Sequence, residues 1–257
     1  MDRRCLYLIA LALCASSCGG GSGSTASAPT APTPVVVAPV AVAPVVIGLS
    51  ITNSISTLLI GQTGTLSATS SYSDGSTRSI LPAWTSGNSS VVSVDGNGRL
   101  TAVGAGSVTI TATAEGRSAT TQVRGLPDFS GNWSVQWRQT TCDVPPRWGA
   151  GFCNISGLYT AKVNLQRSGV DGIVGSYDNG IGWIGTVSGQ VATNGTLSLT
   201  GRLDSPRRTA TFYSNFVSWN AQLTSGLGFT GTFSETMTWV GESQQGFSAG
   251  TMVNATK

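Results

Sequence analysis

The clearest structural signal in this chain is the run Val92-Ser93-Val94-Asp95-Gly96-Asn97-Gly98-Arg99-Leu100-Thr101-Ala102-Val103. Apolar and polar residues alternate on both sides of a central Asp-Gly-Asn-Gly sequence. A period of two is typical of a strand with one buried face, and glycine beside Asp or Asn favours a tight turn. Residues 92–103 therefore predict a β-hairpin.

Short alternating runs also lie on both sides of this hairpin. They occupy residues 47–51, 65–69 and 108–114. A second turn sequence lies at residues 73–76, where Gly75 can adopt a positive φ. About seven short strands in this part of the chain are typical of an antiparallel sandwich of two sheets. Since we find no long helical periodicity, we expect an all-β protein.

Several motifs around the hairpin resemble those of one known family. They are Tyr72-Ser-Asp-Gly-Ser-Thr77, Trp84-Thr-Ser86, Val94-Asp-Gly-Asn-Gly98, Ala102-Val-Gly-Ala-Gly106 and Ile110-Thr-Ala-Thr113. In this order they resemble the bacterial Ig-like group 2 domain over residues 45–124. The resemblance implies an Ig-like β-sandwich of the kind found in bacterial surface proteins and adhesins. Such a module can act as a spacer or can itself bind, and both readings remain open.

Residues 127–257 form a second β region after the boundary sequence Gly125-Leu-Pro-Asp128. Trp133, Val135 and Trp137 alternate with polar residues, and similar runs recur to the C-terminus. The pattern predicts about eight antiparallel strands, each with one buried and one exposed face. An up-and-down β-barrel would satisfy this and leave no free edge, and a second sandwich is the alternative.

The start of this second region, Gly131-Asn132-Trp133, resembles the Gly-x-Trp start of calycin barrels, the lipocalin and avidin-like group. Gly175-Ser-Tyr177 and residues 200–205 are loosely similar to avidin-like strands. The resemblance implies a barrel in which Trp133 either closes one end as a core residue or contacts a ligand. The segment between Cys142 and Cys153 departs from that pattern, and no biotin-binding residues carry over.

The N-terminal residues predict export. Residues 1–17 have a charged start, a short apolar run and small residues before Cys18, the pattern of a secretory signal peptide. They resemble a bacterial lipoprotein signal, although Ala15 stands where the family usually has Leu. The resemblance implies that Cys18 is lipidated and anchors the chain in a membrane, with Gly19 pointing to the outer membrane or cell surface. Residues 18–44 then read as a Gly/Ser/Pro-rich linker.

The remaining cysteines, Cys142 and Cys153, form an even pair in an exported chain, so we expect a disulfide. The chain contains no histidine, and two cysteines alone do not complete a usual zinc site, so no metal is expected. Charged residues make up 10% of the chain and the net charge is +3. Without a basic cluster beyond Arg207-Arg208, we expect no nucleic-acid partner.

Catalytic signals are missing from the sequence. The lack of histidine excludes every mechanism with an imidazole base. We find no nucleophile elbow, phosphate loop or Cys-x-x-Cys pair, so we expect no cofactor and no enzyme. A glycosidase, the least favoured alternative, would need two converging carboxylates. Glu235 lies in phase with Phe233 and Met237 on the apolar face of its predicted strand. A buried carboxylate there would need a partner or a ligand. We expect instead that a bulge at residues 234–236 turns the Glu235 side chain outward.

The candidate binding residues are Arg147, Trp148, Phe152 and Glu235. The first three lie in the loop between the two cysteines, which could present Trp148 to a partner or fold down as a lid on one barrel end. We expect a non-catalytic binding or adhesion role toward a glycan or protein partner. The alternative function is a barrel that holds a small apolar ligand, with inward tryptophans around an empty cavity.

Overall fold

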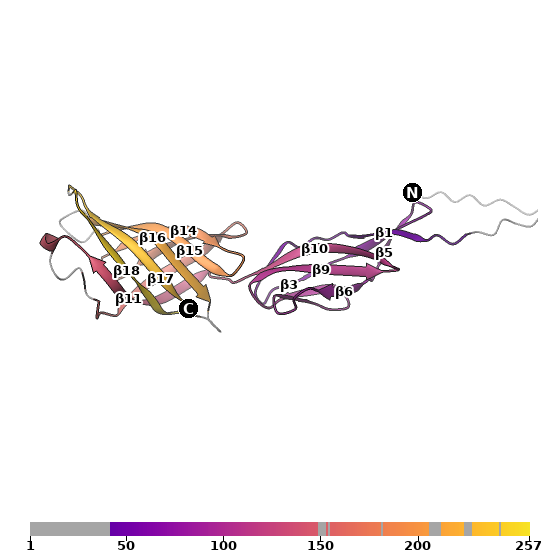
Figure 1. The fold of residues 1–257 in the computed structure, drawn as a ribbon, viewed down its shortest axis with the longest axis horizontal. Helices are drawn as coiled ribbons and strands as arrows, with labels where there is room; N and C mark the ends of the chain where they lie inside the picture. Colours follow the sequence, from indigo (N-terminus) through magenta and orange to yellow (C-terminus); the bar gives the residue numbers. More distant parts are fainter. Residues whose placement is uncertain are drawn as a thin grey trace, which may run out of the picture. The chain divides into compact units, whose positions relative to one another are not determined.

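The computed structural model describes residues 42–148, 153, 155–180, 182–205, 212–223, 228–241 and 243–257, without the side chains of 212–217. The predicted signal peptide, Cys18 and nearly all of the predicted linker therefore lie outside the described residues. The described part is almost entirely β-structure (Figure 1), which confirms the all-β prediction. Its one short helical segment is the 3₁₀ turn η1 (Pro146–Trp148), and no helix there is long and apolar enough to cross a membrane.

The first module consists of ten short strands in three small sheets, paired in the orders β1-β4-β5, β2-β10-β9-β6 and β3-β8-β7. The strands are β1 (Val46–Ile51), β2 (Thr57–Leu59), β3 (Thr63–Thr65), β4 (Ala68–Tyr72), β5 (Thr77–Ile80), β6 (Ala83–Ser86), β7 (Val92–Val94), β8 (Arg99–Ala102), β9 (Gly106–Ala114) and β10 (Arg117–Leu126). Their inward residues form one apolar core that includes Trp84, Leu100 and Ile110. This is the sandwich core of an Ig-like module.

Both predicted hairpins are present in this module. In β7–β8, Val92 pairs with Ala102 and Val94 pairs with Leu100. The Asp95 carboxylate accepts hydrogen bonds from the backbone N–H groups of Asn97 and Arg99, both at 2.9 Å, which fixes the turn. In the β4–β5 turn Gly75 has φ +79°, as the turn sequence predicts.

The module differs from the expected two antiparallel sheets at one place. β2 pairs parallel to β10, and β3, only a few residues later, pairs with β8 in a separate sheet. Gly61, with φ +88°, lies between them. Its N–H bonds the Ala102 carbonyl of β8, while the N–H of Ile60 bonds Leu126 of β10. The chain therefore crosses from one sheet to the other in three residues, which a residue with a Cβ would do only with strain.

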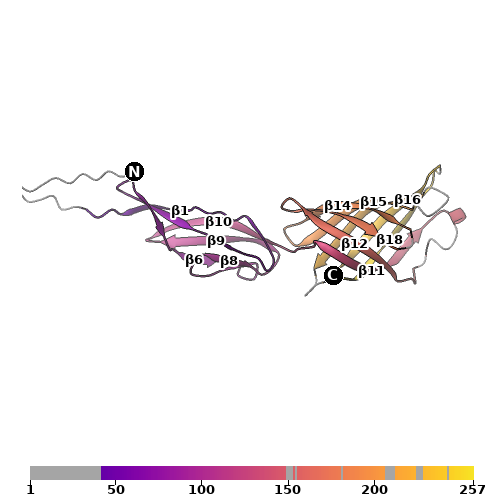
Figure 2. The ribbon, with the colours of Figure 1, turned by 180° about the vertical axis from the view of Figure 1, so that it is seen from behind.

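The second module is a closed antiparallel barrel in which each strand pairs with the next and the last pairs with the first (Figure 2). The strands are β11 (Gly131–Asp143), β12 (Tyr159–Ser168), β13 (Gly172–Asp178), β14 (Ile184–Val191), β15 (Thr196–Asp204), β16 (Phe212–Leu223), β17 (Phe229–Trp239) and β18 (Gln245–Thr256). This confirms the predicted up-and-down barrel of eight strands and excludes a second sandwich. Closure leaves no strand edge for unwanted pairing.

Glycines on the inner face let the barrel wall bend. A Cβ added to Gly189 on β14 would overlap the Ser198 carbonyl oxygen of β15, and one added to Gly231 on β17 would overlap the Asn220 carbonyl of β16. At these positions the neighbouring backbone occupies the volume that a side chain would need. Inward glycines are a common means of curving a sheet enough to close it.

The two ends of the barrel differ in what fills them. The chain enters at the proximal end, where β11, β13, β15 and β17 begin. Here the interior is a packed apolar core whose largest members include Phe129, Trp133, Leu165, Leu197, Trp219 and Phe229. Phe229 lies edge-on to Phe129 and to Trp133, with ring centroids at 5.9 and 4.8 Å. The distal end, where β11, β13, β15 and β17 finish, carries the polar and aromatic residues described next.

Candidate functional site

Glu235 lies inside the distal half of the barrel. It follows Phe229, Gly231 and Phe233 on the inward face of β17, and its relative exposure is only 9%. The expected outward bulge at residues 234–236 is wrong. The irregularity instead lies in the neighbouring strand β16, which has one extra residue between Phe216 and Ser218. Because β16 takes up the extra residue, β17 keeps its alternation and carries the carboxylate inward.

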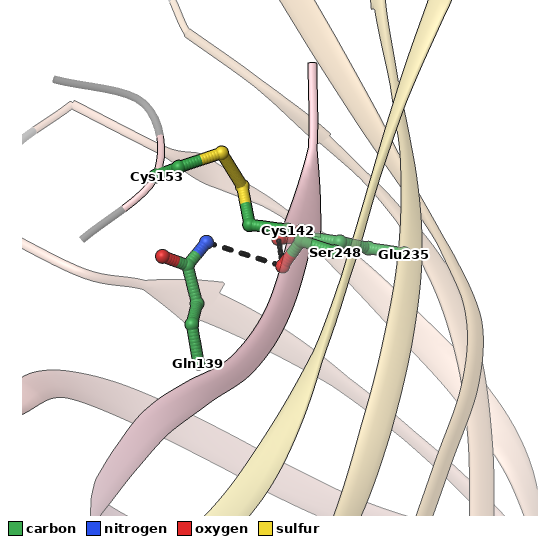
Figure 3. Close-up of a disulfide and its surroundings, with 5 residues drawn as sticks. All are labelled: Gln139, Cys142, Cys153, Glu235 and Ser248. Carbon is green, nitrogen blue, oxygen red and sulfur yellow. Dashed lines mark hydrogen bonds between the residues drawn. A yellow bond between two sulfur atoms is a disulfide. The ribbon is translucent and has the colours of Figure 1, made fainter. Parts of the chain in front are cut away.

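The Glu235 carboxylate is held by a chain of hydrogen bonds across three strands (Figure 3). The Ser248 hydroxyl of β18 donates to Glu235 Oε1 at 3.0 Å, and the Gln139 side-chain amide of β11 donates to Ser248 Oγ at 3.1 Å. Ser248 is fully buried and Gln139 nearly so. Burial of these polar groups is tolerated because they bond one another. The chain joins β17 and β18 to β11, where the barrel closes.

A disulfide adjoins this polar chain. Cys142 lies opposite Ser248 in the β11–β18 register, and its sulfur is bonded to that of Cys153, with Cα atoms 5.6 Å apart. The disulfide prediction is confirmed. The bond encloses the loop that follows β11 and fixes the start of that loop beside the barrel end.

Tyr177 adds a neutral hydroxyl to the same part of the interior. It is the last inward residue of β13 and is buried. Burial raises the pKa of its phenol well above the usual value, and the negative charge of Glu235 raises this pKa further. Tyr177 therefore remains protonated at neutral pH.

Aromatic rings gather at the distal end. The Trp137 ring stacks on Tyr159 of β12, with centroids 4.4 Å apart and planes at 19°, and meets Phe233 edge-on at 5.0 Å. Trp183 and Trp239 are partly buried, and both pack against the buried pair Trp148 and Met237. These rings leave partly exposed indole and phenol surface around the end of the barrel that holds Glu235.

Trp148 closes part of this end. Its relative exposure is 6%, and its ring lies 6.4 Å from that of Trp239 and against Met237. Gly246 makes room for it, because a Cβ at that position would lie 2.7 Å from Trp148 Cζ3. Of the two alternatives for Trp148, packing onto the barrel end is the one that the structure shows; residues 149–152 and 154 lie outside the described part. We call this residue the Trp148 cap.

The structure says less about Arg147 and Phe152, the other two candidate binding residues of the loop. Arg147, the residue before the cap, is exposed, and Phe152 lies outside the described residues. The structure therefore brings Trp148 and Glu235 to the same end of the barrel but gives no account of Phe152. Whether these residues bind a partner stays a prediction.

Sequence reasoning missed the residues that surround Glu235. Gln139, Tyr177 and Ser248 all lie in phase with inward neighbours, so strict alternation along β11, β13 and β18 marks them as interior. Their proximity to Glu235 depends on strand order and on the tilt of the strands in the barrel, which a single sequence does not reveal.

The acidic side chains in the described part of the barrel differ in burial. Glu235 is the one buried acid there, whereas Asp143, Asp178 and Asp204 are exposed. Within the same described residues, no group of three or more Cys, Asp or Glu side chains is placed to hold a metal ion.

These features define an all-β chain with an Ig-like module followed by an eight-stranded barrel. Residues 45–124 match the bacterial Ig-like domain (group 2), the family that the motifs around the first hairpin resemble. Modules of this family occur in bacterial extracellular and surface proteins, which points to an exported chain. A relative from Clostridium acetobutylicum, itself described as an uncharacterized protein, is 40% identical over 75 residues. That match covers 29% of this chain and 18% of the relative, so the chain spans less than a fifth of it.

Proposed function

We propose that this chain is an exported lipoprotein, anchored through Cys18 at the outer membrane or cell surface, whose barrel binds a partner without catalysis. The Ig-like module and the residue pattern of the first 44 residues support export. In this proposal the linker and the Ig-like module hold the barrel away from the membrane. The partner is a glycan or another surface protein.

The observation that carries the binding role is the concentration of aromatic rings at the distal end. Trp137, Trp183 and Trp239 are each partly exposed there, and the exposed Arg147 lies beside the Trp148 cap. Tryptophan faces stack on sugar rings, and tryptophan and arginine are the residues most enriched at the energetic centres of protein interfaces. The proximal end offers no comparable surface, because its large rings are buried in the core.

The residues argue for binding rather than catalysis. The chain has no histidine, and the described part of the barrel buries a single acid. Glycoside hydrolysis needs two carboxylates across a cleft, which gives that alternative no support. A purely apolar ligand is also disfavoured, because side chains fill the proximal half of the barrel and the distal half carries Glu235 and its polar partners.

The anchor can be tested by changing Cys18 to serine. A thioether-linked lipid cannot form on a hydroxyl, so the C18S chain is expected to lose fatty-acid labelling and to accumulate as a precursor or in the soluble fraction. Metabolic labelling with a fatty-acid analogue, followed by fractionation of cells, measures both effects. The variant C14S serves as the matched control and should label like the unchanged protein. Labelling that persists in C18S would show that the anchor is elsewhere.

The binding role can be tested on an array of bacterial glycans and surface proteins. We expect at least one ligand whose signal falls roughly fivefold or more when Trp239 or Arg147 is changed to alanine, as for residues that contribute more than about 1 kcal/mol to an interface. Arg138, exposed on the outer face of β11, provides the control variant R138A, which should bind normally. An array without a ligand, or one on which all three variants bind equally, would contradict the proposal.

A further inference from the structure

We propose that a hollow on the outer wall of the barrel binds an uncharged sugar residue of a glycan. The hollow lies over the neighbouring strands β14, β15 and β16 (Figure 2), and its volume is about 420 Å³. Sites for small ligands usually measure about 300–1,000 Å³. The inference goes beyond the proposed function, because it concerns the wall of the barrel and does not depend on the aromatic distal end.

Six polar side chains line the hollow: Ser188, Gln190, Ser198, Thr200, Ser218 and Asn220. The strand register arranges most of them in two rows. Gln190 lies opposite Ser198 and Ser198 opposite Asn220, while Ser188 lies opposite Thr200. Neighbouring strands are about 4.8 Å apart, and alternate residues of one strand are about 7 Å apart. A sugar ring with its hydroxyl groups can therefore contact both rows.

Longer side chains bound the hollow at both ends of these strands. Toward the proximal end, the Gln222 side-chain amide donates to Thr196 Oγ1 at 3.2 Å. Toward the distal end, Arg202 Nε donates to the Asp204 carboxylate at 3.1 Å. Between these two pairs, four of the six polar lining side chains are serine or threonine. The short side chains leave the wall lower there, which explains the hollow.

The floor of the hollow is held in place by the barrel core behind it. The inward neighbours of the lining residues, Leu197, Leu199 and Trp219, belong to the apolar core and are at most 3% exposed. The extra residue of β16 lies directly before Ser218, and bulges of this kind often re-aim a side chain beside a binding site. A site formed in advance loses little conformational entropy when a ligand binds.

The hydrogen-bonding groups of the hollow match those of a sugar. The Ser198 hydroxyl donates to Asn220 Oδ1 at 2.7 Å, which orients the amide and leaves its N–H donors for a ligand. Within the described part of the chain, the Ser188 hydroxyl and the Gln190 amide have no hydrogen-bond partner in the protein. Hydroxyl and amide groups both donate and accept hydrogen bonds, as the hydroxyl groups of a sugar do.

The charge of the hollow favours an uncharged ligand. None of the described residues that line it is charged, so an ionised ligand would lose hydration without gaining an opposite charge. The lining also contains no aromatic ring on which a sugar could stack, so we expect weak binding, with a dissociation constant in the millimolar range. Because the hollow is open to solvent, it can hold one residue of a longer glycan chain.

Titration of the full chain with cellohexaose, maltohexaose and mannohexaose tests the proposal, with acidic hexagalacturonate for comparison. Calorimetry and the broadening of the ligand's NMR signals report binding. We expect saturable binding of at least one neutral hexasaccharide, at least tenfold tighter than that of hexagalacturonate. The S188L variant should bind it at least fivefold more weakly, because the larger side chain fills the hollow. The matched control S176L makes the same change on the exposed face of β13 and should bind normally.

A second pair of variants removes hydrogen-bonding groups without filling the hollow. N220A deletes the amide that Ser198 orients and should weaken sugar binding at least fivefold. Asn132 accepts a hydrogen bond from the Asn164 amide at 2.6 Å in a similar exposed pair on β11 and β12. The control N132A should therefore bind the sugar like the unchanged protein.

The outcomes separate this site from the proposed function. If no neutral hexasaccharide binds, if hexagalacturonate binds as tightly, or if S188L and S176L bind equally, the wall site is refuted. A sugar whose binding falls in W239A and not in S188L belongs to the distal end, which supports the proposed function and overturns the wall site. If S188L weakens sugar binding while the array gives no ligand sensitive to Trp239 or Arg147, the wall site stands and the proposed role of the distal end fails. Circular dichroism and thermal unfolding of S188L and N220A establish that a loss of binding does not reflect a loss of fold.

Discussion

The F229A variant is expected to lose about 3–5 kcal/mol of barrel stability, the usual cost of removing a fully buried phenylalanine. Phe229 has no exposed surface, and its ring lies against three aromatic rings, those of Phe129, Trp133 and Trp219. Its removal leaves a cavity that these rings fill only partly, since Trp133 is also tied by its indole N–H to the Phe129 carbonyl at 2.6 Å. Denaturant unfolding followed by tryptophan fluorescence measures the loss.

The probe and the control suit this measurement. Six of the seven tryptophans lie in the barrel and one, Trp84, lies in the Ig-like module, so fluorescence reports mainly on the barrel. Phe247 on the outer face of β18 is 44% exposed and provides the matched variant F247A. Its loss is expected to be near 0.5 kcal/mol, as for an ordinary surface change. Equal losses for the two variants would mean that the aromatic cluster of the proximal end does not stabilise the barrel.

Most of this fold could be predicted because apolar and polar residues alternate along its strands. Along β12, Ala161, Val163 and Leu165 point inward, and the polar residues between them face outward. Local patterning of this kind predicts strand number and the buried face. It does not predict closure, which depends on the pairing of β18 with β11, more than a hundred residues apart in sequence. That expectation came from the need to leave no free strand edge and from the resemblance of Gly131-Asn-Trp133 to calycin barrels, and a second sandwich stayed open as the alternative.

The candidate site was harder to predict for an equally physical reason. A one-residue irregularity inverts every side chain beyond it, and sequence does not show which of two neighbouring strands carries it. For Glu235 we predicted the bulge in its own strand, β17, whereas the neighbouring strand β16 contains the extra residue. Similarly, whether Trp148 is displayed or buried depends on Gly246, about a hundred residues later, which leaves space for its ring.

The double variant C142S/C153S is expected to lose about 3 kcal/mol of stability and to release the Trp148 cap. The disulfide joins residues 11 apart in sequence, and the chain-entropy model assigns about 3 kcal/mol to a ring of that size. Without it, the loop regains conformational freedom, and the packing of Trp148 on Met237 must hold the loop alone. We expect the fluorescence of Trp148 to shift to longer wavelength and to become more accessible to acrylamide.

The contribution of Trp148 can be isolated from the other tryptophans by adding W148F to both the unchanged protein and the double variant and subtracting the spectra. Dithiothreitol should shift the unchanged protein to the spectrum of the double variant and should leave the double variant unaltered. Because Cys142 lies opposite Ser248, which bonds Glu235, release of the loop should also increase access to the carboxylate. If acrylamide quenches Trp148 to the same extent in the two forms, the disulfide stabilises the barrel without holding the Trp148 cap in place, and the packing of Trp148 on Met237 is sufficient to hold it.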